Sequence, residues 1–421
     1  MRISLAFSLA ISVVCGLIGL SATMAKATNL QVVYAFDRTT AQAHQEIRER
    51  FEKENPGISV EFLAAAQNYE DASQSIIRSA MIGDLPDVTF QGLNLVRGLV
   101  DRGIAVPLDP FIARDGGADK LGYDAGMLRV AAVNGKTFGI PFAVSTPLLY
   151  VNVDLVKAAG GDIGAFPTRW EDIVALGRKI DDPARSITGF YFQWDITGNW
   201  MFQSLLDANG GSMMSSDEKA IAFDQPPGKA ALETLELFAK AKMPNLPSSQ
   251  ARPAFMAGKI GIFADSSSNL GAAIRQIGSS FEMRTLRFPL GVADGRLPAG
   301  GNLAAMLCKD PEKQAAAWKY IKFATGPVGQ TIMARHTGYL PSNSIAVNTP
   351  ELLGDFYKAN TNFQASIAQL PILTGWYAFP GPNAVKIIDV IKGHTEAVVT
   401  GRKSAAETMP AMAADVRKLL E

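Results

Sequence analysis

Strand-like and helix-like segments alternate through the N-terminal part of this 421-residue chain, and this alternation constrains the fold most. Residues 30–35 are an apolar run typical of a buried strand, and apolar residues every four positions predict a helix over 41–54. An Asn-Pro-Gly turn ends that helix. The pattern then continues with strands at 58–62 and 87–90 and helices at 71–81 and 93–100. Strands and helices at this spacing predict an α/β fold whose sheet is mainly parallel.

The first 27 residues have the features of a secretory signal peptide. Arg2 gives a positive start, residues 3–20 are mostly apolar, and Ala-Lys-Ala at 25–27 fits the cleavage pattern. A membrane anchor is one alternative, which glycines in the apolar stretch weaken. Lipid attachment at Cys15 is another, but the residues before it give a poor context. We therefore expect export to the periplasm and cleavage after about Ala27.

Size and charge narrow the classes of protein further. Cleavage would remove Arg2 and Lys26, so that 38 basic residues face 40 acidic ones. No basic stripe is visible, which argues against nucleic acid as a partner. Cys308 would be the only cysteine left, so no internal disulfide can form. A chain of this length exceeds one ordinary core and suggests two domains.

No motif for catalysis or metal binding stands out. The three histidines, His44, His336 and His394, have no second ligand at metal spacing. The chain has no Gly-x-Ser-x-Gly elbow and no phosphate-binding loop. We therefore predict no metal, no cofactor and no catalytic residue. A secreted glycoside hydrolase stays open as a distant alternative, because its two carboxylates need not be close in sequence.

Four loops combine aromatic side chains with short polar ones, which is the chemistry that sugar and polyol sites need. The residues that carry this chemistry are Tyr69, Trp194, Asp195, Trp200, Asp265, Ser266, Ser268 and Trp376. One such loop would be ordinary turn chemistry. Four of them in an exported α/β chain indicate a binding site for a sugar or polyol.

A series of short motifs runs along nearly the whole mature chain. In order they are Gly83-x-x-Pro-Asp-Val88, Ser145-Thr-Pro-Leu-Leu-Tyr150, Pro167-Thr-x-Trp-Glu-Asp172, Phe255-x-x-Gly-Lys259 and Thr337-Gly-Tyr-Leu-Pro341. They resemble the extracellular solute-binding proteins of bacterial ABC importers. The similarity is to the carbohydrate family that includes maltose-binding and glycerol-3-phosphate-binding proteins. Each motif alone is weak or moderate, whereas their shared order and spacing are specific.

This resemblance implies a two-lobed periplasmic-binding-protein fold of type II. Each lobe would be a mainly parallel sheet flanked by helices, with the ligand cleft between the lobes. Lobe 1 would comprise 28–143 and 302–345, and lobe 2 would comprise 147–298 and 350–421. Hinge crossings would lie near 144–146, 299–301 and 346–349. The implied partners are a small solute and the permease subunits at the inner membrane, and the protein would act as a monomer.

The resemblance also implies residue roles. In the glycerol-phosphate branch, the residues that match Tyr69, Ser145, one serine of 266–268, Gly301 and Tyr339 surround the ligand. A loop that matches 194–200 lies under the ligand, and the sequence leaves open whether Trp194 or Trp200 stacks on it.

Two departures from that branch concern the phosphate. The branch has an arginine near the position of Ala378 and a glutamate near Leu93 or Asn94, and this chain has neither. We still count Asn94 among the expected ligand-binding residues. A neutral sugar or polyol is therefore favoured, and no basic cluster is evident, so we expect binding to depend little on salt. Glycerol 3-phosphate or a glycerophosphodiester is the alternative, if Arg335 or His336 holds the anion.

Overall fold

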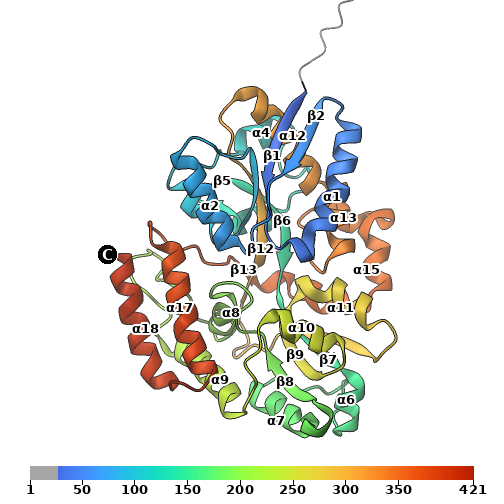
Figure 1. Cartoon of the computed structure of the whole chain (residues 1–421), viewed down its shortest axis with the longest axis vertical. Coiled ribbons are helices and arrows are strands. Elements are labelled where there is room, and N and C mark those ends of the chain that lie inside the picture. The colour runs from blue at the N-terminus through green and yellow to red at the C-terminus, as the bar shows by residue number, and fades with distance from the viewer. Residues whose placement is uncertain (1–26) are drawn as a thin grey trace, which may run out of the picture.

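The computed structural model describes residues 27–421, so the expected signal peptide lies, except for Ala27, outside the described residues. Two sheets, each flanked by helices, form an upper and a lower lobe (Figure 1). We call the part built on the five-stranded sheet lobe 1 and the part built on the four-stranded sheet lobe 2. The residue boundaries given above for the lobes stay a prediction.

The sheet of lobe 1 has the order β2-β1-β3-β12-β6. Its strands are β1 (Thr28–Val33), β2 (Ile58–Phe62), β3 (Val88–Gly92), β6 (Gly139–Ser145) and β12 (Gly300–Met306). β1 is parallel to β2 and β3, while β12 is antiparallel to both β3 and β6. Four of the five strands thus share a direction, as the alternation of strands and helices predicts.

The sheet of lobe 2 has the order β10-β7-β9-β8. Its strands are β7 (Pro147–Asn152), β8 (Thr188–Phe192), β9 (Ile260–Ser266) and β10 (Met283–Arg287). β8 and β9 are parallel, and β7 is antiparallel to β9 and β10. One strand in each sheet therefore runs antiparallel to the others: β12 in lobe 1 and β7 in lobe 2. Each of them directly follows a crossing from the other lobe.

The two crossings by strands are very short. Thr146 alone separates β6 from β7, and Ala299 alone separates β12 from β11 (Leu297–Pro298). Thr146 is fully buried, and its backbone N–H donates to Ser267 Oγ at 3.1 Å. Its hydroxyl accepts from Gln369 Nε2 at 2.8 Å. These two hydrogen bonds anchor Thr146, the first crossing, to lobe 2.

Helices flank both sheets, and the first eleven lie between residues 37 and 277. The N-terminal helices are α1 (Asp37–Glu54), α2 (Tyr69–Met81), α3 (Val96–Val100), α4 (Asp109–Arg114) and α5 (Ala125–Val130). The middle of the chain adds α6 (Val153–Ala158), α7 (Trp170–Ile180), α8 (Trp200–Ala208), α9 (Pro226–Lys240), α10 (Ser248–Met256) and α11 (Leu270–Ile277).

The C-terminal part is largely helical. Its helices are α12 (Pro311–Thr325), α13 (Pro327–His336), α14 (Ser344–Asn348), α15 (Asp355–Ala359), α16 (Gln364–Ile367), α17 (Ala384–Val399) and α18 (Ala405–Leu420). Short strands β4 (Ala132–Val133), β5 (Lys136–Thr137) and β13 (Leu373–Thr374) complete the fold. Over residues 27–421, no helix is both long and apolar enough to cross a membrane.

Aromatic clusters stabilise each lobe. In lobe 1 the buried ring of His44 packs against Tyr34 and Phe90, with ring centroids 4.4 and 4.5 Å away. In lobe 2 Trp170 lies 5.1 to 6.2 Å from the rings of Phe190, Phe192, Phe238 and Phe288. Buried aromatic pairs of this kind give a core both area and a defined geometry. They fix the sheets from which the cavity loops extend.

Candidate functional site

A cavity of about 640 Å³ lies between the two lobes. Lobe 1 contributes the start of α1, the segment after β2 and Tyr69 at the start of α2. Lobe 2 contributes α10, the end of β9, and Asn269 with the α11 residues Ala272, Arg275 and Gln276. Residues at both crossings, Ser145 and Gly300, also line it. A solute held here would touch both lobes at once.

Seven of the twelve residues singled out in the sequence line this cavity. They are Tyr69, Ser145, Trp200, Ser266, Ser268, Gly301 and Tyr339. Burial raises the pKa of both tyrosines, so their hydroxyls stay protonated and can donate hydrogen bonds. Tyr69 is held in place because its hydroxyl accepts from Asn302 Nδ2 at 3.1 Å.

The other five residues lie outside the cavity lining. Trp194 Nε1 donates to Asn245 Oδ1 at 3.1 Å, and Asp195 accepts from Gln193 Nε2. Asp265 is fully buried in an ion pair with Arg252. Asn94 and Trp376 are both buried, and Trp376 instead borders a second, smaller cavity. Their role as ligand contacts stays a prediction that this geometry does not favour.

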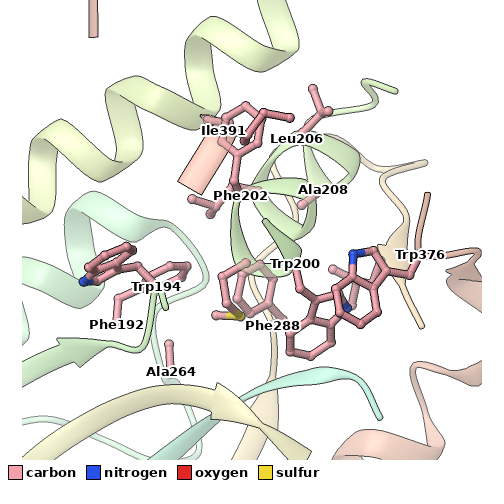
Figure 2. Packing of buried hydrophobic residues seen from close by; sticks show 14 of the residues in the cluster. Phe192, Trp194, Trp200, Phe202, Leu206, Ala208, Ala264, Phe288, Trp376 and Ile391 are labelled. Carbon is pink, nitrogen blue, oxygen red and sulfur yellow. The ribbon is translucent and has the colours of Figure 1, made fainter. Parts of the chain in front are cut away.

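The two indoles of the Trp-rich loop have different positions. Figure 2 shows Trp200 beside Trp376, with Trp194 on the far side of the cluster. The Trp200 and Trp376 ring centroids are 6.4 Å apart, and Trp200 Nε1 donates to the carbonyl of Pro298 at 3.2 Å. Trp200 thus forms part of the cavity wall next to the second crossing, whereas Trp194 faces Asn245.

Glycine is required at the second crossing. Gly301 has φ +106°, a conformation that other residues rarely adopt, and a Cβ there would lie 1.9 Å from the carbonyl oxygen of Ala143. At Gly300 a Cβ would lie 2.7 Å from Ser145 Oγ and 2.8 Å from the Trp200 ring. The absence of side chains therefore lets β12 approach β6 and leaves room beside Ser145 and Trp200.

The structure brings together basic residues that sequence analysis missed. Arg38, Arg252 and Arg275 all line the cavity, although they are far apart in the sequence. Arg252 donates through Nε and Nη2 to the two carboxylate oxygens of Asp265, at 2.8 and 3.0 Å. The premise that no basic cluster exists was therefore wrong. No spacing pattern would have revealed it, because the three arginines come from α1, α10 and α11.

The two residues that the sequence offered for binding an anion, Arg335 and His336, are arranged differently. Arg335 does not line the cavity, and its Nη2 donates to the carbonyl of Leu352 at 2.7 Å. His336 does line it, but its Nε2 lies 2.7 Å from Glu46 Oε2. This hydrogen bond is also the main reason why the pKa of Glu46 is lowered. Arg335 is thus not among the arginines of the cavity wall, whereas Arg252 is.

Glu70 is a buried carboxylate near the site that sequence analysis also missed. Its oxygens accept from the hydroxyl of Thr197 at 3.1 and 3.2 Å, and Thr197 lines the cavity. Burial raises the pKa of Glu70. Since Glu70 belongs to α2 and Thr197 to the loop before α8, this hydrogen bond joins the two lobes beside the cavity.

Two sheet-based lobes, joined by short crossings around a polar and aromatic cavity, define the class of two-lobed ligand-binding proteins. The chain belongs to the bacterial extracellular solute-binding protein family, whose profile matches residues 46–365. The family resemblance seen in the sequence motifs is therefore confirmed.

Relatives and solved structures agree with this assignment. A putative binding protein of Brucella abortus is 24% identical over 394 residues, which cover 90% of this chain and 92% of that protein. The UgpB structure from Mycobacterium tuberculosis in complex with glycerophosphocholine has a TM-score of 0.81 at 21% identity, over 93% of this chain and 98% of that one. A solute-binding protein from Thermotoga lettingae bound with α-D-tagatose has a TM-score of 0.79 at 19% identity, over 94% and 100%. The predicted two-lobed α/β fold of type II is confirmed.

Proposed function

We propose that the protein is the periplasmic substrate-binding component of an ABC importer, which captures a sugar or polyol and delivers it to the membrane permease. The observation that carries this proposal is the interlobe cavity, which combines the Trp200 ring with the polar groups of Ser145, Ser266 and Tyr69. A flat indole suits the C–H face of a sugar, and hydroxyls suit its oxygen atoms. Membership of the solute-binding family supports the same role.

The proposed mechanism is capture by lobe closure. A solute that touches both lobes binds the closed arrangement more tightly than the open one, and this difference shifts the population towards closure. The single-residue crossings at Thr146 and Ala299 suit a hinge, because few torsion angles need to change. The permease subunits would then recognise the closed form, and the solute would leave unaltered.

A second candidate is a binding protein for glycerol 3-phosphate or a glycerophosphodiester. The specific observation in its favour is the presence of Arg38, Arg252 and Arg275 in the cavity. The similar UgpB structure holds glycerophosphocholine, which is also consistent with this candidate.

Glycoside hydrolysis has little support in the cavity. Such an enzyme needs two carboxyl groups that flank the sugar. Among the described lining residues, Asp37 is the one carboxylate, and it accepts a hydrogen bond from the Tyr34 hydroxyl at 2.7 Å. We therefore propose a carrier and not an enzyme. Mass spectrometry of a bound solute after incubation should return it unchanged, and a hydrolysis product would contradict the proposal.

A thermal-shift screen of monosaccharides, disaccharides, polyols and glycerophosphodiesters tests the proposed function. A compound that binds only the folded cleft raises the melting temperature by mass action. We expect at least one compound of these classes to do so, in proportion to the logarithm of its concentration. A screen in which none of them stabilises the protein would contradict the proposal.

Export to the periplasm, cleavage after about Ala27 and a monomeric state complete the proposal. They rest on the family and on the sequence of the first 27 residues. N-terminal mass spectrometry of the protein from a periplasmic extract should show a chain that starts near Thr28. Size-exclusion chromatography with light scattering should give the mass of one chain.

A further inference from the structure

One face of α8 connects the wall of the interlobe cavity to a buried carboxyl group. Trp200, Gln203 and Asp207 follow one another at spacings of three and four residues, so their side chains lie on the same side of this helix. All three are buried, with exposed fractions of 1%, 3% and 4%. Trp200 lines the cavity, whereas Asp207 lies further along the helix and does not. An ionisable group is thus buried on the helix that carries the indole of the cavity wall.

The side-chain amide of Gln203 connects Asp207 to residues 375–377. Gln203 Nε2 donates to Asp207 Oδ2 at 3.1 Å and to the carbonyl of Gly375 at 3.2 Å. Gln203 Oε1 accepts from the backbone N–H of Tyr377 at 3.1 Å. Residues 375–377 belong to no helix or strand, so they lack the backbone hydrogen bonds of such an element. The Gln203 amide therefore holds this segment against α8.

The segment 375–377 also contacts the cavity wall and the other lobe. The Trp376 ring lies 6.4 Å from the Trp200 ring, measured between centroids. The hydroxyl of Tyr377 donates at 2.9 Å to Glu218, the carboxylate that also accepts from Arg97 of lobe 1. The segment, Arg97 and Glu218 all border the second cavity, which gives the segment room to move. A shift of this segment would therefore change both the support of Trp200 and the contact between the lobes.

No cation offsets the burial of Asp207. Gln203 is the one described residue that donates to its side chain, and α8 carries no other ionisable residue. The backbone N–H of Arg296 donates to the Asp207 carbonyl at 3.0 Å, but the side chains of Arg296 and Asp294 in the loop before β11 are exposed. β11 has no ionisable side chain, and the hydroxyl of Tyr377 is paired with Glu218. The charged residues of α9, which packs on α8, are exposed or half-buried: Lys229, Glu233, Glu236 and Lys240.

This environment favours the neutral form of Asp207. Burial raises its pKa from 3.8 to about 7. A carboxyl group that water reaches has a pKa near the lower value. As the pH rises from about 4 to about 7, the packed arrangement therefore loses stability relative to one in which Asp207 is hydrated. Displacement of residues 375–377 is the least disruptive way to admit water, because this neighbour of α8 has no regular secondary structure.

We propose that Asp207 is a positioning residue: its ionisation releases residues 375–377 from α8 and so weakens the contact of Tyr377 with Glu218. The lobes then stay together more readily in a mildly acidic medium than in a mildly alkaline one. The inference goes beyond the proposed function, because it concerns the ligand-free protein and does not depend on which solute binds.

Hydrogen–deuterium exchange of the ligand-free protein, followed by mass spectrometry, tests the release. The peptide that contains Tyr377 is measured from pH 5 to pH 8, and its protection is expressed relative to an unstructured peptide at the same pH. We expect protection to fall by about tenfold or more over this range, because ionisation favours the released arrangement until the packed one also ionises. A flat profile in the unmodified protein would overturn the proposal.

Substitutions then assign the effect to Asp207 and Gln203. Asp207→Asn keeps the shape and cannot ionise, so we expect high protection at every pH. Gln203→Met removes the connection, and we expect low protection at every pH. Asp389→Asn is the matched control, because Asp389 is another carboxyl group with a raised pKa but lies on α17, outside this chain of hydrogen bonds. Its profile should match that of the unmodified protein.

The variants can contradict the proposal separately. The profile of the unmodified protein in Asp207→Asn would show that another group titrates, and the same profile in Gln203→Met would show that the amide is not the connection. Melting curves establish that each variant is folded, and the profile of the unmodified protein remains decisive if one is not.

Small-angle X-ray scattering of the ligand-free protein tests the link to the lobes. We expect the radius of gyration of the unmodified protein to increase from pH 5 to pH 8 and that of Asp207→Asn to stay constant. Equal responses in the two proteins, or none in the unmodified protein, would overturn the coupling between residues 375–377 and the lobes.

Discussion

At the scale of single residues, the two indoles of the Trp-rich loop give a direct test of the cavity. Trp200 lines it and Trp194 does not. We expect Trp200→Ala to weaken binding of the best polyol about tenfold or more, because an aromatic platform is lost. Trp194→Ala should stay within about twofold of the unmodified protein. Calorimetry of both variants checks this, and an equal loss in the two would show that the wall assignment is wrong.

His44 is a residue whose burial gives a prediction about pH. Burial among aromatic rings lowers the pKa of His44 from its ordinary value to about 3. The unfolded chain therefore takes up a proton below about pH 6.5, while the folded protein does not do so until about pH 3. The stability that neutral His44 contributes is thus fully present above about pH 6.5 and is lost as the pH falls from there to about pH 3.

Substitution of His44 isolates that contribution. His44→Phe keeps an aromatic ring in the cluster and removes the titrating group. Between pH 7 and pH 5, we expect the free energy of unfolding to fall less in the variant than in the unmodified protein. The difference between the two slopes should reach up to about 1.4 kcal/mol per pH unit below pH 6.5. Urea unfolding at several pH values measures this difference. Parallel pH profiles for the two proteins would mean that His44 does not contribute.

Some residues of the cavity wall could be predicted from the family resemblance. Ser145, Gly301 and Tyr339 were named from it and do line the cavity, while their contact with a ligand stays a prediction. Arg252 was missed because its meaning depends on Asp265, thirteen positions away on another element. Trp376 was named for its aromatic neighbours, but tertiary packing turns it to a second cavity. Side-chain direction in a loop is set by packing, which no local pattern records.

At the scale of elements, α12 depends on the residue that precedes it. Asp310 Oδ1 accepts from the backbone N–H groups of Glu312 and Lys313, at 3.0 and 2.9 Å, and so caps the helix. We expect Asp310→Ala to lower the free energy of unfolding by about 1 kcal/mol, because two amide donors lose their acceptor. Asp310→Asn keeps the acceptor and serves as the control. Urea unfolding that shows no difference between Ala and Asn would contradict the prediction.

Helices and strands with a regular spacing of apolar residues were predicted well, whereas the aromatic strand β8 was not predicted. The first strands and helices appear close to their predicted ranges, because their apolar spacing is regular. The helix expected from residue 93 begins instead at Val96, since the backbone N–H of Leu93 still donates to Gly301 in β12. β8 was not predicted, because Phe190, Tyr191 and Phe192 are all buried and so do not alternate with polar residues.

At the scale of the whole molecule, an ion pair links the lobes at a distance from the cavity. Arg97 of α3 donates from Nη1 and Nη2 to the two carboxylate oxygens of Glu218, at 2.6 and 2.8 Å. The hydroxyl of Tyr377 also donates to Glu218, at 2.9 Å. Glu218 has φ +58°, a left-handed conformation that is rare for residues other than glycine. The loop between α8 and α9 thus presents this carboxylate to the other lobe.

Removal of Glu218 should loosen the two lobes. We expect Glu218→Ala to broaden the range of lobe orientations in the ligand-free protein, which small-angle X-ray scattering detects as a changed radius of gyration. Glu282→Ala is the control, because Glu282 pairs with Lys157 and Arg284, both of them in lobe 2. Identical scattering curves for Glu218→Ala and Glu282→Ala would contradict the prediction. This contact could not be foreseen, since it joins residues 121 positions apart without a shared motif.

The position of β12 has a consequence for how the chain must fold. β12 lies between β3 and β6 in the first sheet, although it is the last of the five strands to be synthesised. A nascent chain therefore holds both neighbours long before their common partner, and direct pairing of β3 with β6 would close the gap wrongly. Correct folding requires that β3 and β6 do not pair with each other before residues 300–306 are available to pair with both. Contacts between residues so distant in sequence form slowly. A fragment that ends before residue 300 therefore lacks the strand that joins β3 to β6, and it cannot form the complete sheet of lobe 1.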